Sequence, residues 1–324
     1  MVSCSVDFVV TDPPYGLKFM GKKWDYQIPS VEIWHELLRV CKPGAMILCF
    51  GGTRTFHRLT CNIEDAGWEI RDCMMWLYGS GFPKSHNNFG LEGYGTALKP
   101  AWEPIIMAMK PLTGTYEENF KKWKIGGINI DDSRIGTGGT KRSHQSDYPK
   151  NEDGTEDRSE HWARTGHSIE AIDKGRWPAN LILDEEAGTM LDEQSGISFS
   201  PKEIVKGAGR SGGIKGKTTG HHFQQGHGDS GGASRFFYCA KVSPSERGKH
   251  NNHPTIKPQK LLEYLIKLLA PSGNPILLDP FCGSGSTLVA CKTLGVQGIG
   301  IDICEEYCEI AKKRIEFIPE SDDK

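Results

Sequence analysis

The sequence predicts an α/β fold built on an open, mostly parallel sheet with helices on both faces and an irregular, glycine-rich insert. Short apolar runs alternate with segments of helical periodicity in residues 1–110 and again in residues 250–318. This alternation is the rhythm of βαβ units. Residues 111–245 lose that rhythm and contain a glycine-rich stretch from 206 to 232, which predicts the insert.

The elements of the first region follow from apolar spacing and turn residues. The apolar run Val6–Val10 is typical of a buried strand, and it ends at the turn Asp12-Pro13-Pro14-Tyr15. Residues 31–40 have apolar side chains at helical spacing, with Ser30 as the expected N-cap. We expect further strands at 45–50, 68–78 and 104–109, and a helix through Phe56, Leu59 and Ile63.

The last region repeats this pattern and adds a glycine-rich turn. After a helix with an apolar face, a short strand at 276–278 is expected to end at Asp279. The turn Phe-Cys-Gly-Ser-Gly at 281–285 then opens a second helix. The next strand, at 299–301, is expected to end at Asp302. The apolar face of the first helix consists of Leu261, Leu262, Leu265, Ile266 and Leu269.

This layout is typical of a nucleoside-binding unit. Glycines let a ligand approach the backbone, and an acid at the second strand end binds ribose hydroxyls. The alternative is an ordinary turn between a strand and a helix. A dinucleotide site needs a third glycine where Leu288 stands, and the GSGFPKS stretch at 79–85 has Pro83 where a P-loop needs glycine. S-adenosylmethionine has no phosphate and carries a cationic sulfonium, so acids such as Asp279 and Asp302 suit it.

Composition excludes several classes of protein. The formal net charge is −2, so the overall charge gives no indication of nucleic-acid binding. Ten cysteines occur without CxxC pairs, and the closest pair has no histidine partner, which indicates neither a disulfide framework nor a metal site. No secretion signal or membrane-spanning run is present. We therefore expect a soluble protein of the reduced cytoplasm.

The near-neutral net charge conceals two opposed blocks in the middle region. Residues 151–200 carry four basic residues against twelve acids, and residues 201–250 carry nine against three. Lysine, arginine and histidine supply counter-charge for phosphates, and glycine lets the backbone approach them. The basic block is therefore open to two interpretations, a flexible solvated loop or a segment that follows a DNA backbone.

The motifs together resemble a known family. TDPPYG at 11–16, HPTIKP at 253–258 and DPFCGSG at 279–285 look like the amino-methyltransferases of DNA, which modify adenine N6 or cytosine N4. The order, with the catalytic tetrapeptide first and the cofactor loop last, resembles the β-group. The likeness covers roughly residues 5–110 and 250–315. It implies a Rossmann-like methyltransferase sheet, with residues 1–110 as catalytic half, 111–249 as target-recognition region and 250–324 as cofactor half.

The resemblance also implies roles for single residues. Asp12 and the Pro13 carbonyl would accept the N–H groups of the target amine, Pro14 would stiffen the turn, and Tyr15 would stack on a flipped base. Trp24 would line the base pocket, or else cover the core as a loop tryptophan. His253, Thr255 and Lys257 would flank the methionine end of the cofactor. The cofactor-binding residues expected around the glycine turn are Asp279, Phe281, Gly283, Ser284, Gly285 and Asp302.

Several alternatives remain open at the sequence level. An aspartate before the two prolines goes more often with adenine in this family, so Asp12 favours N6-adenine over N4-cytosine. A strand and a Gly-Asp turn normally precede the catalytic strand in β-group relatives, whereas here only Met1–Ser5 do. We therefore expect either a truncated start or a cofactor pocket closed without that element. The alternative from another class is an inactive DNA-binding remnant.

The expected partner is double-stranded DNA, which would bring the protein to the nucleoid, and not a membrane. A second copy of the chain and a restriction endonuclease are two further partner hypotheses that the resemblance raises. Methylation of protein glutamine or of RNA is disfavoured, because those relatives more often carry asparagine where Asp12 stands and lack a long late insert.

Overall fold

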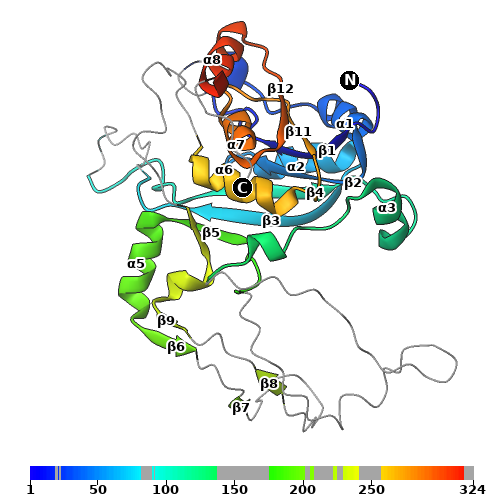
Figure 1. Ribbon diagram of the computed structural model, residues 1–324. Coiled ribbons are helices and arrows are strands. Elements are labelled where there is room, and N and C mark those ends of the chain that lie inside the picture. The colour runs from blue at the N-terminus through cyan, green and yellow to red at the C-terminus, as the bar shows by residue number, and fades with distance from the viewer. Residues whose placement is uncertain are drawn as a thin grey trace, which may run out of the picture.

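A mixed eight-stranded sheet forms the centre of the molecule (Figure 1). The computed structural model describes residues 1–18, 21, 23–81, 90, 92–136, 175–200, 205–207, 222–224, 229–240 and 257–316. The strands of the sheet are β1 (Val6–Thr11), β2 (Cys41–Phe50), β3 (Glu69–Leu77), β4 (Trp102–Met109), β5 (Leu181–Asp184), β10 (Tyr238–Ala240), β11 (Ile276–Asp279) and β12 (Gln297–Gly300). Their spatial order is β10-β5-β3-β4-β2-β1-β11-β12. Only β4 runs antiparallel to its neighbours, so the sheet is mostly parallel, as predicted.

Helices cover both faces of this sheet, and each face has its own apolar core. On one face, α1 (Val31–Val40) and α2 (Phe56–Asp65) bury Trp34, Leu59 and Ile63 against Val9 and Ile47. On the other, α6 (Gln259–Leu269) and α7 (Ser286–Leu294) pack on the opposite side chains of the same strands. Every residue of β1 is buried, which is why its sequence is mostly apolar rather than alternating; Asp7 and Thr11 are its buried polar residues.

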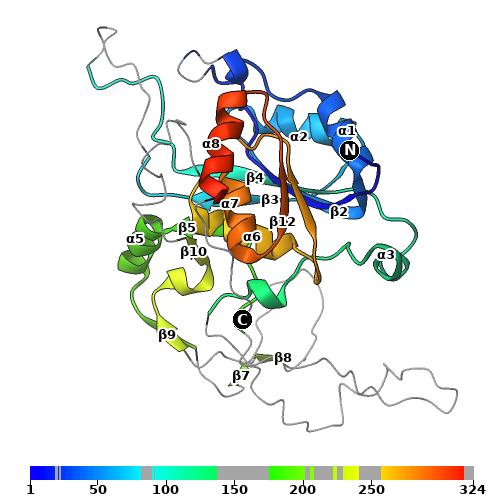
Figure 2. The same cartoon turned by 45° about the horizontal axis from the view of Figure 1, so that its top comes forward.

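The remaining described helices lie outside these two layers. The last helix, α8 (Glu305–Glu316), lies beside α7 near β12 (Figure 2). Helix α3 (Tyr116–Trp123) begins with a capping box between Thr115 and Glu118. The other elements are α5 (Glu185–Ser195) and the short 3-10 turns η2 (Lys23–Asp25), η3 (Asp131–Ser133) and η4 (Ala233–Phe236).

The predicted elements of the first and last regions are confirmed, with shifts at two strands. Strand β2 begins at Cys41 and includes Pro43 and Gly44, four residues before the predicted start at 45. Strand β12 spans Gln297–Gly300 instead of the predicted 299–301. The register explains this second shift, because Ile276 pairs with Gln297 and Asp279 with Gly300. The bounds of β12 are therefore set by its pairing with β11 and not by the positions of its β-branched side chains.

The expected loss of α/β rhythm in residues 111–245 is wrong for part of that region. Strand β5 and helix α5 follow one another directly, and β5 pairs in parallel with β3 while β10 pairs in parallel with β5. The two strands have only four and three residues, too short to show a period in the sequence. Outside the main sheet lie two small ribbons, β6 (Ser198–Ser200) with β9 (Asp229–Gly231), and β7 (Val205–Gly207) with β8 (His222–Gln224).

Two expectations from composition concerned disulfides and membrane-spanning segments. All ten cysteines carry free thiols. Among the residues that the structure describes, none of the helices is long and apolar enough to cross a membrane.

Candidate active site

The two sequence motifs meet at the carboxyl ends of adjacent parallel strands. Phe8 and Val9 of β1 pair with Leu277 and Leu278 of β11, so both strands end at the same edge of the sheet. Just beyond this pairing, two residues after Val9 and one after Leu278, the Thr11 hydroxyl donates a 2.7 Å hydrogen bond to Asp279 Oδ1. Open α/β sheets bind ligands at this edge. The fold therefore brings the turn at 12–15 beside the glycine turn at 281–285, more than 260 residues later.

Tyr15 is held through its side chain and through its backbone. Its hydroxyl lies 2.8 Å from Asp12 Oδ1, and its carbonyl accepts a 2.7 Å hydrogen bond from the Thr55 hydroxyl. A Cβ at Gly52 would lie 3.1 Å from the Tyr15 ring, so glycine gives the ring room to lie against this turn. Pro13 is buried and Pro14 is half-buried, which leaves the tetrapeptide a stiff, partly accessible tip.

Asp25 fixes the backbone that follows the tetrapeptide, a role that sequence reasoning missed. Its carboxylate accepts hydrogen bonds from the backbone N–H groups of Tyr15 at 2.7 Å, Gly16 at 3.0 Å and Leu17 at 3.2 Å. Only 3% of Asp25 is exposed. A buried carboxylate with several N–H donors holds a loop strongly. An acid ten residues after Tyr15 gives no recognisable signal in a single sequence.

Lys257 lies against the tetrapeptide itself. Its ammonium is 2.8 Å from Asp12 Oδ2 and 3.0 Å from the Tyr15 hydroxyl. It also forms a 3.1 Å ion pair with Glu103 of β4, a second residue that sequence reasoning missed. Burial alone favours a neutral lysine, but the carboxylates of Asp12 and Glu103 outweigh it and raise the pKa of Lys257 above its usual value. The ammonium is therefore charged throughout the physiological range.

Asp302 organises the glycine turn. Its Oδ2 accepts a 2.9 Å hydrogen bond from the Gly283 N–H, and its Oδ1 accepts one of 2.8 Å from Cys304. Gly283 and Gly285 have φ angles of +49° and +81°, a region that favours glycine. Ser284 is buried, and its hydroxyl accepts a 3.0 Å hydrogen bond from the Arg314 guanidinium of α8. The turn is thus shaped by backbone conformation and by one acid.

Asp279 is buried at the junction of the two motifs. Burial raises the pKa of this carboxyl to about 6, although hydrogen bonds from Thr11, Thr287 and Phe281 act in the opposite direction. The nearby Asp12 carboxylate adds to the rise of the pKa. Close to neutral pH this group is therefore part protonated, and it joins β11 to β1 rather than facing solvent.

The other predicted site residues lie away from the contact between the two motifs or outside the described residues. Phe281 packs its ring 6.3 Å from that of Trp34, against the core of the α1 face. Trp24 is half-buried and interacts with the Tyr307 hydroxyl on α8. Its assignment to a base pocket stays a prediction. His253 and Thr255 lie outside the described residues.

The acidic residues of the site suit a cationic ligand. Asp12, Asp279 and Asp302 contribute carboxylates along one edge of the sheet, and Lys257 is already paired with two carboxylates. Opposite charges stabilise each other in such a partly buried place. The chemistry of these residues therefore fits a sulfonium-bearing cofactor.

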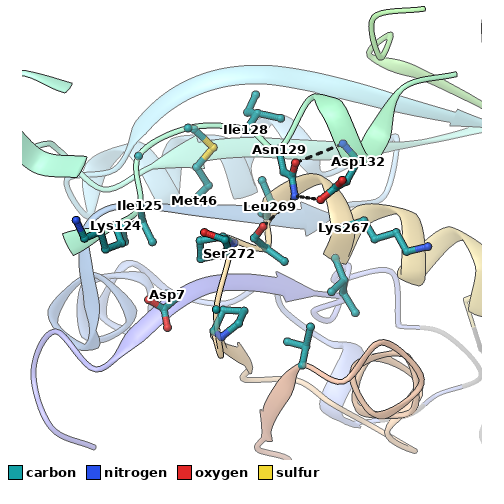
Figure 3. Close-up of a pocket in the computed structure, with 18 of the residues that line it drawn as sticks. Asp7, Met46, Lys124, Ile125, Ile128, Asn129, Asp132, Lys267, Leu269 and Ser272 are labelled. Carbon is teal, nitrogen blue, oxygen red and sulfur yellow. Dashed lines mark hydrogen bonds between the residues drawn. The ribbon is translucent and has the colours of Figure 1, made fainter. Parts of the chain in front are cut away.

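A separate cavity of about 500 Å³ lies at the opposite end of the strands (Figure 3). Asp7 at the start of β1 lines it, together with Met46, Asn129 and Lys267. The Asp7 carboxylate is already bonded to Lys42 at 2.6 Å and to the Ile276 N–H at 2.9 Å. The cavity thus adjoins the amino ends of β1 and β11 and contains neither motif.

Comparison with known proteins finds one family model that matches most of the chain and curated relatives that match about a quarter of it. A family model described as a DNA methylase, N6_N4_Mtase, matches residues 6–313. The type II methyltransferase M.HpaI of Haemophilus parainfluenzae is 43% identical over 83 residues, which cover 26% of this chain and 24% of that protein. M2.DpnII of Streptococcus pneumoniae is 53% identical over 64 residues, covering 20% and 24%. The chain thus spans about a quarter of the length of these curated relatives.

Solved structures of DNA methyltransferases align with this chain at low sequence identity. The cytosine-N4-specific PvuII DNA methyltransferase aligns with a TM-score of 0.50 and 13% identity, covering 100% of this chain and 83% of that one. The M1.HpyAVI–SAM complex aligns with a TM-score of 0.45 and 19% identity, covering 96% and 89%. At 13% identity, the PvuII alignment bears on the fold alone.

Proposed function

Because this chain belongs to that DNA methylase family, we propose that it is a DNA methyltransferase that methylates the N6 amine of an adenine flipped out of the duplex. The single observation that carries this proposal is the adjacency of the two motifs, held by the hydrogen bond from Thr11 to Asp279. A methyl acceptor site needs a donor site beside it, and neighbouring strand ends supply both.

Asp12 and the Pro13 carbonyl serve the acceptor side. The lone pair of an exocyclic amine is delocalised into the base, so the amine is a poor nucleophile. Acceptors that draw its N–H groups localise the lone pair on nitrogen and orient it. Tyr15 supplies a ring for stacking, worth about 1–3 kcal/mol per base. The stiff proline turn and the Asp25 carboxylate keep these groups in place.

The methyl donor is S-adenosylmethionine. When bound, it supplies a methyl group activated by the positive sulfonium. In this chain the turn at 281–285 would hold it, with Gly283 and Gly285 allowing close approach and Asp302 fixing the turn. Asp12 contributes a carboxylate on the tetrapeptide side, and the buried Asp279 joins the two strand ends through its hydrogen bond with Thr11. The family membership and the type II methyltransferases among the relatives support this choice.

Methyl transfer from labelled cofactor to unmethylated DNA tests the proposal. The Asp12→Ala variant is expected to lose about a hundredfold or more of kcat, since removing one preorganised polar group at a reacting centre costs that much. Asp65→Ala, which removes an exposed carboxylate from α2, is the matched control and should keep its activity. Transfer that survives in Asp12→Ala would contradict the assigned chemistry.

N4-cytosine is the second candidate base. The family covers both amines, and the PvuII enzyme that shares the fold is specific for cytosine N4. Asp12 before the two prolines favours adenine. Digestion of the product DNA to nucleosides separates 6-methyladenine from 4-methylcytosine. Retained DNA binding together with no S-adenosylmethionine binding in calorimetry would instead favour a non-catalytic protein.

A further inference from the structure

Two carboxylates share the same two donors at the end of β1. The Lys257 ammonium lies 2.8 Å from Asp12 Oδ2 and 3.1 Å from Glu103 Oε2. The Tyr15 hydroxyl lies 2.8 Å from Asp12 Oδ1 and 3.1 Å from the same Glu103 oxygen. These four side chains come from three segments that are far apart in the sequence, and nothing in the Asp-Pro-Pro-Tyr motif itself requires Glu103.

Asp12 and Glu103 therefore compete for the Tyr15 hydroxyl and the Lys257 ammonium. A tyrosine hydroxyl has one hydrogen, so it donates to one carboxylate at a time, whereas an ammonium has three and can serve both. The Lys257 side chain is only 10% exposed, so water offers it few substitutes. Two carboxylates and one ammonium leave a net charge of −1, and each donor has an alternative acceptor within reach.

The competition matters because Asp12 has both oxygens engaged. Oδ1 faces the Tyr15 hydroxyl and Oδ2 faces Lys257. A carboxylate paired with an ammonium is a weaker acceptor for a neutral N–H, since the cation withdraws its negative charge. A target amine therefore meets an occupied Asp12 unless the two donors can be released to another acceptor.

We propose that Glu103 is a positioning residue that takes over the Tyr15 hydroxyl and the Lys257 ammonium when the target amine bonds to Asp12. This rests on the proposed methyl transfer at the same site. Glu103 suits the role because its backbone belongs to β4, where residue 103 pairs with Trp76 of β3, and the residues of β4 from Ile105 on also pair with β2. Its carboxylate can thus receive both donors without movement of the main chain.

The test compares Glu103→Gln with wild type in methyl transfer. The neutral amide is nearly isosteric but accepts hydrogen bonds more weakly, so kcat should fall by about tenfold or more. The dissociation constant for S-adenosylmethionine and the KM for DNA should stay within about twofold, since neither ligand is held by Glu103. Glu103→Asp keeps the charge and should recover part of kcat. Glu69→Gln, an exposed glutamate on β3, is the control.

A double-mutant cycle separates this role from a merely structural one. Once Lys257→Met removes the competing ammonium, Glu103→Gln should cost no more than about twofold in kcat, so the two effects are not additive. If Lys257→Met does not fold, as thermal unfolding reports, the cycle is run with Tyr15→Phe, in which the cost of Glu103→Gln should also shrink.

Equal kcat for Glu103→Gln and wild type, or fully additive losses in the cycle, would overturn the proposal while leaving the methyl transfer intact. A wild-type protein that transfers no methyl group to DNA would overturn the proposed function first, and this inference with it.

Discussion

At the residue scale, Tyr15 combines two properties that substitution can separate. Burial, together with the carboxylates of Asp12 and Glu103, raises the pKa of Tyr15 well above its usual value. The hydroxyl therefore stays protonated at physiological pH, and it serves as a donor. Its ring, which Gly52 accommodates, offers a stacking surface.

Tyr15→Phe keeps the ring and Tyr15→Ala removes it. Stacking of about 1–3 kcal/mol predicts that kcat/KM on DNA falls about fivefold to 150-fold further in the alanine variant than in the phenylalanine variant. Steady-state kinetics on unmethylated DNA measures the difference. Equal losses in the two variants would show that the ring contributes nothing to base binding.

Asp279 predicts a pH-dependent stability. The rise of its pKa from 3.8 to about 6 corresponds to a cost on the order of 3 kcal/mol for holding it ionised in the fold. A raised carboxyl pKa means that the folded state binds the proton more tightly than the unfolded state. The stabilisation from this group is thus greatest at low pH and is lost as pH rises from about 4 through about 6.

Asp279→Asn removes that cost and keeps an acceptor oxygen for Thr11 and Phe281. The free energy of unfolding of Asp279→Asn, without cofactor, should equal or exceed that of wild type at pH 8, and the gain should vanish near pH 4. Urea unfolding at both pH values measures it. A variant that is less stable than wild type at pH 8 by the same amount as at pH 4 would contradict the assignment.

At the element scale, Gly285 determines how closely α8 packs on the start of α7. It has a φ angle of +81°, and a Cβ added there would lie 2.6 Å from the Ala311 Cβ. Gly285→Ala therefore combines backbone strain with overlap and is expected to lower the free energy of unfolding by about 2–4 kcal/mol.

Gly273→Ala is the matched control for Gly285. It has a φ angle of +104° but meets nothing within 4 Å, so only backbone strain remains. The difference between the two variants in urea unfolding isolates the helix contact. Equal losses in both would contradict the packing argument.

Elements long enough to show a clear apolar pattern were predictable from the sequence, whereas contacts between distant segments were not. Strand β1 and helix α6 were recognisable in the sequence because an element that is buried along its length or on one face needs apolar residues there. The three-residue strand β10 carries no such signal. Glu103 on β4 and Lys257 in the segment before α6 meet beside the end of β1 only in the folded sheet, and no local pattern encodes this contact.

At the scale of the whole molecule, the sheet order places the first strand, β1, beside β11 from the last region. Strand β1, from the start of the chain, lies between β2 and β11, so the last region completes a sheet begun more than 260 residues earlier. The tetrapeptide and the glycine turn then share one edge, and Lys257 from the segment before α6 reaches the tetrapeptide. The candidate site therefore exists only in the fully assembled fold.

The most direct measurement of the central claim is base-resolved sequencing of DNA from cells that express either the wild-type chain or Asp12→Ala. Wild type is expected to leave 6-methyladenine at one recurring sequence, and Asp12→Ala is expected to leave none. Unmodified DNA in both cases, or 4-methylcytosine in place of 6-methyladenine, would contradict the account.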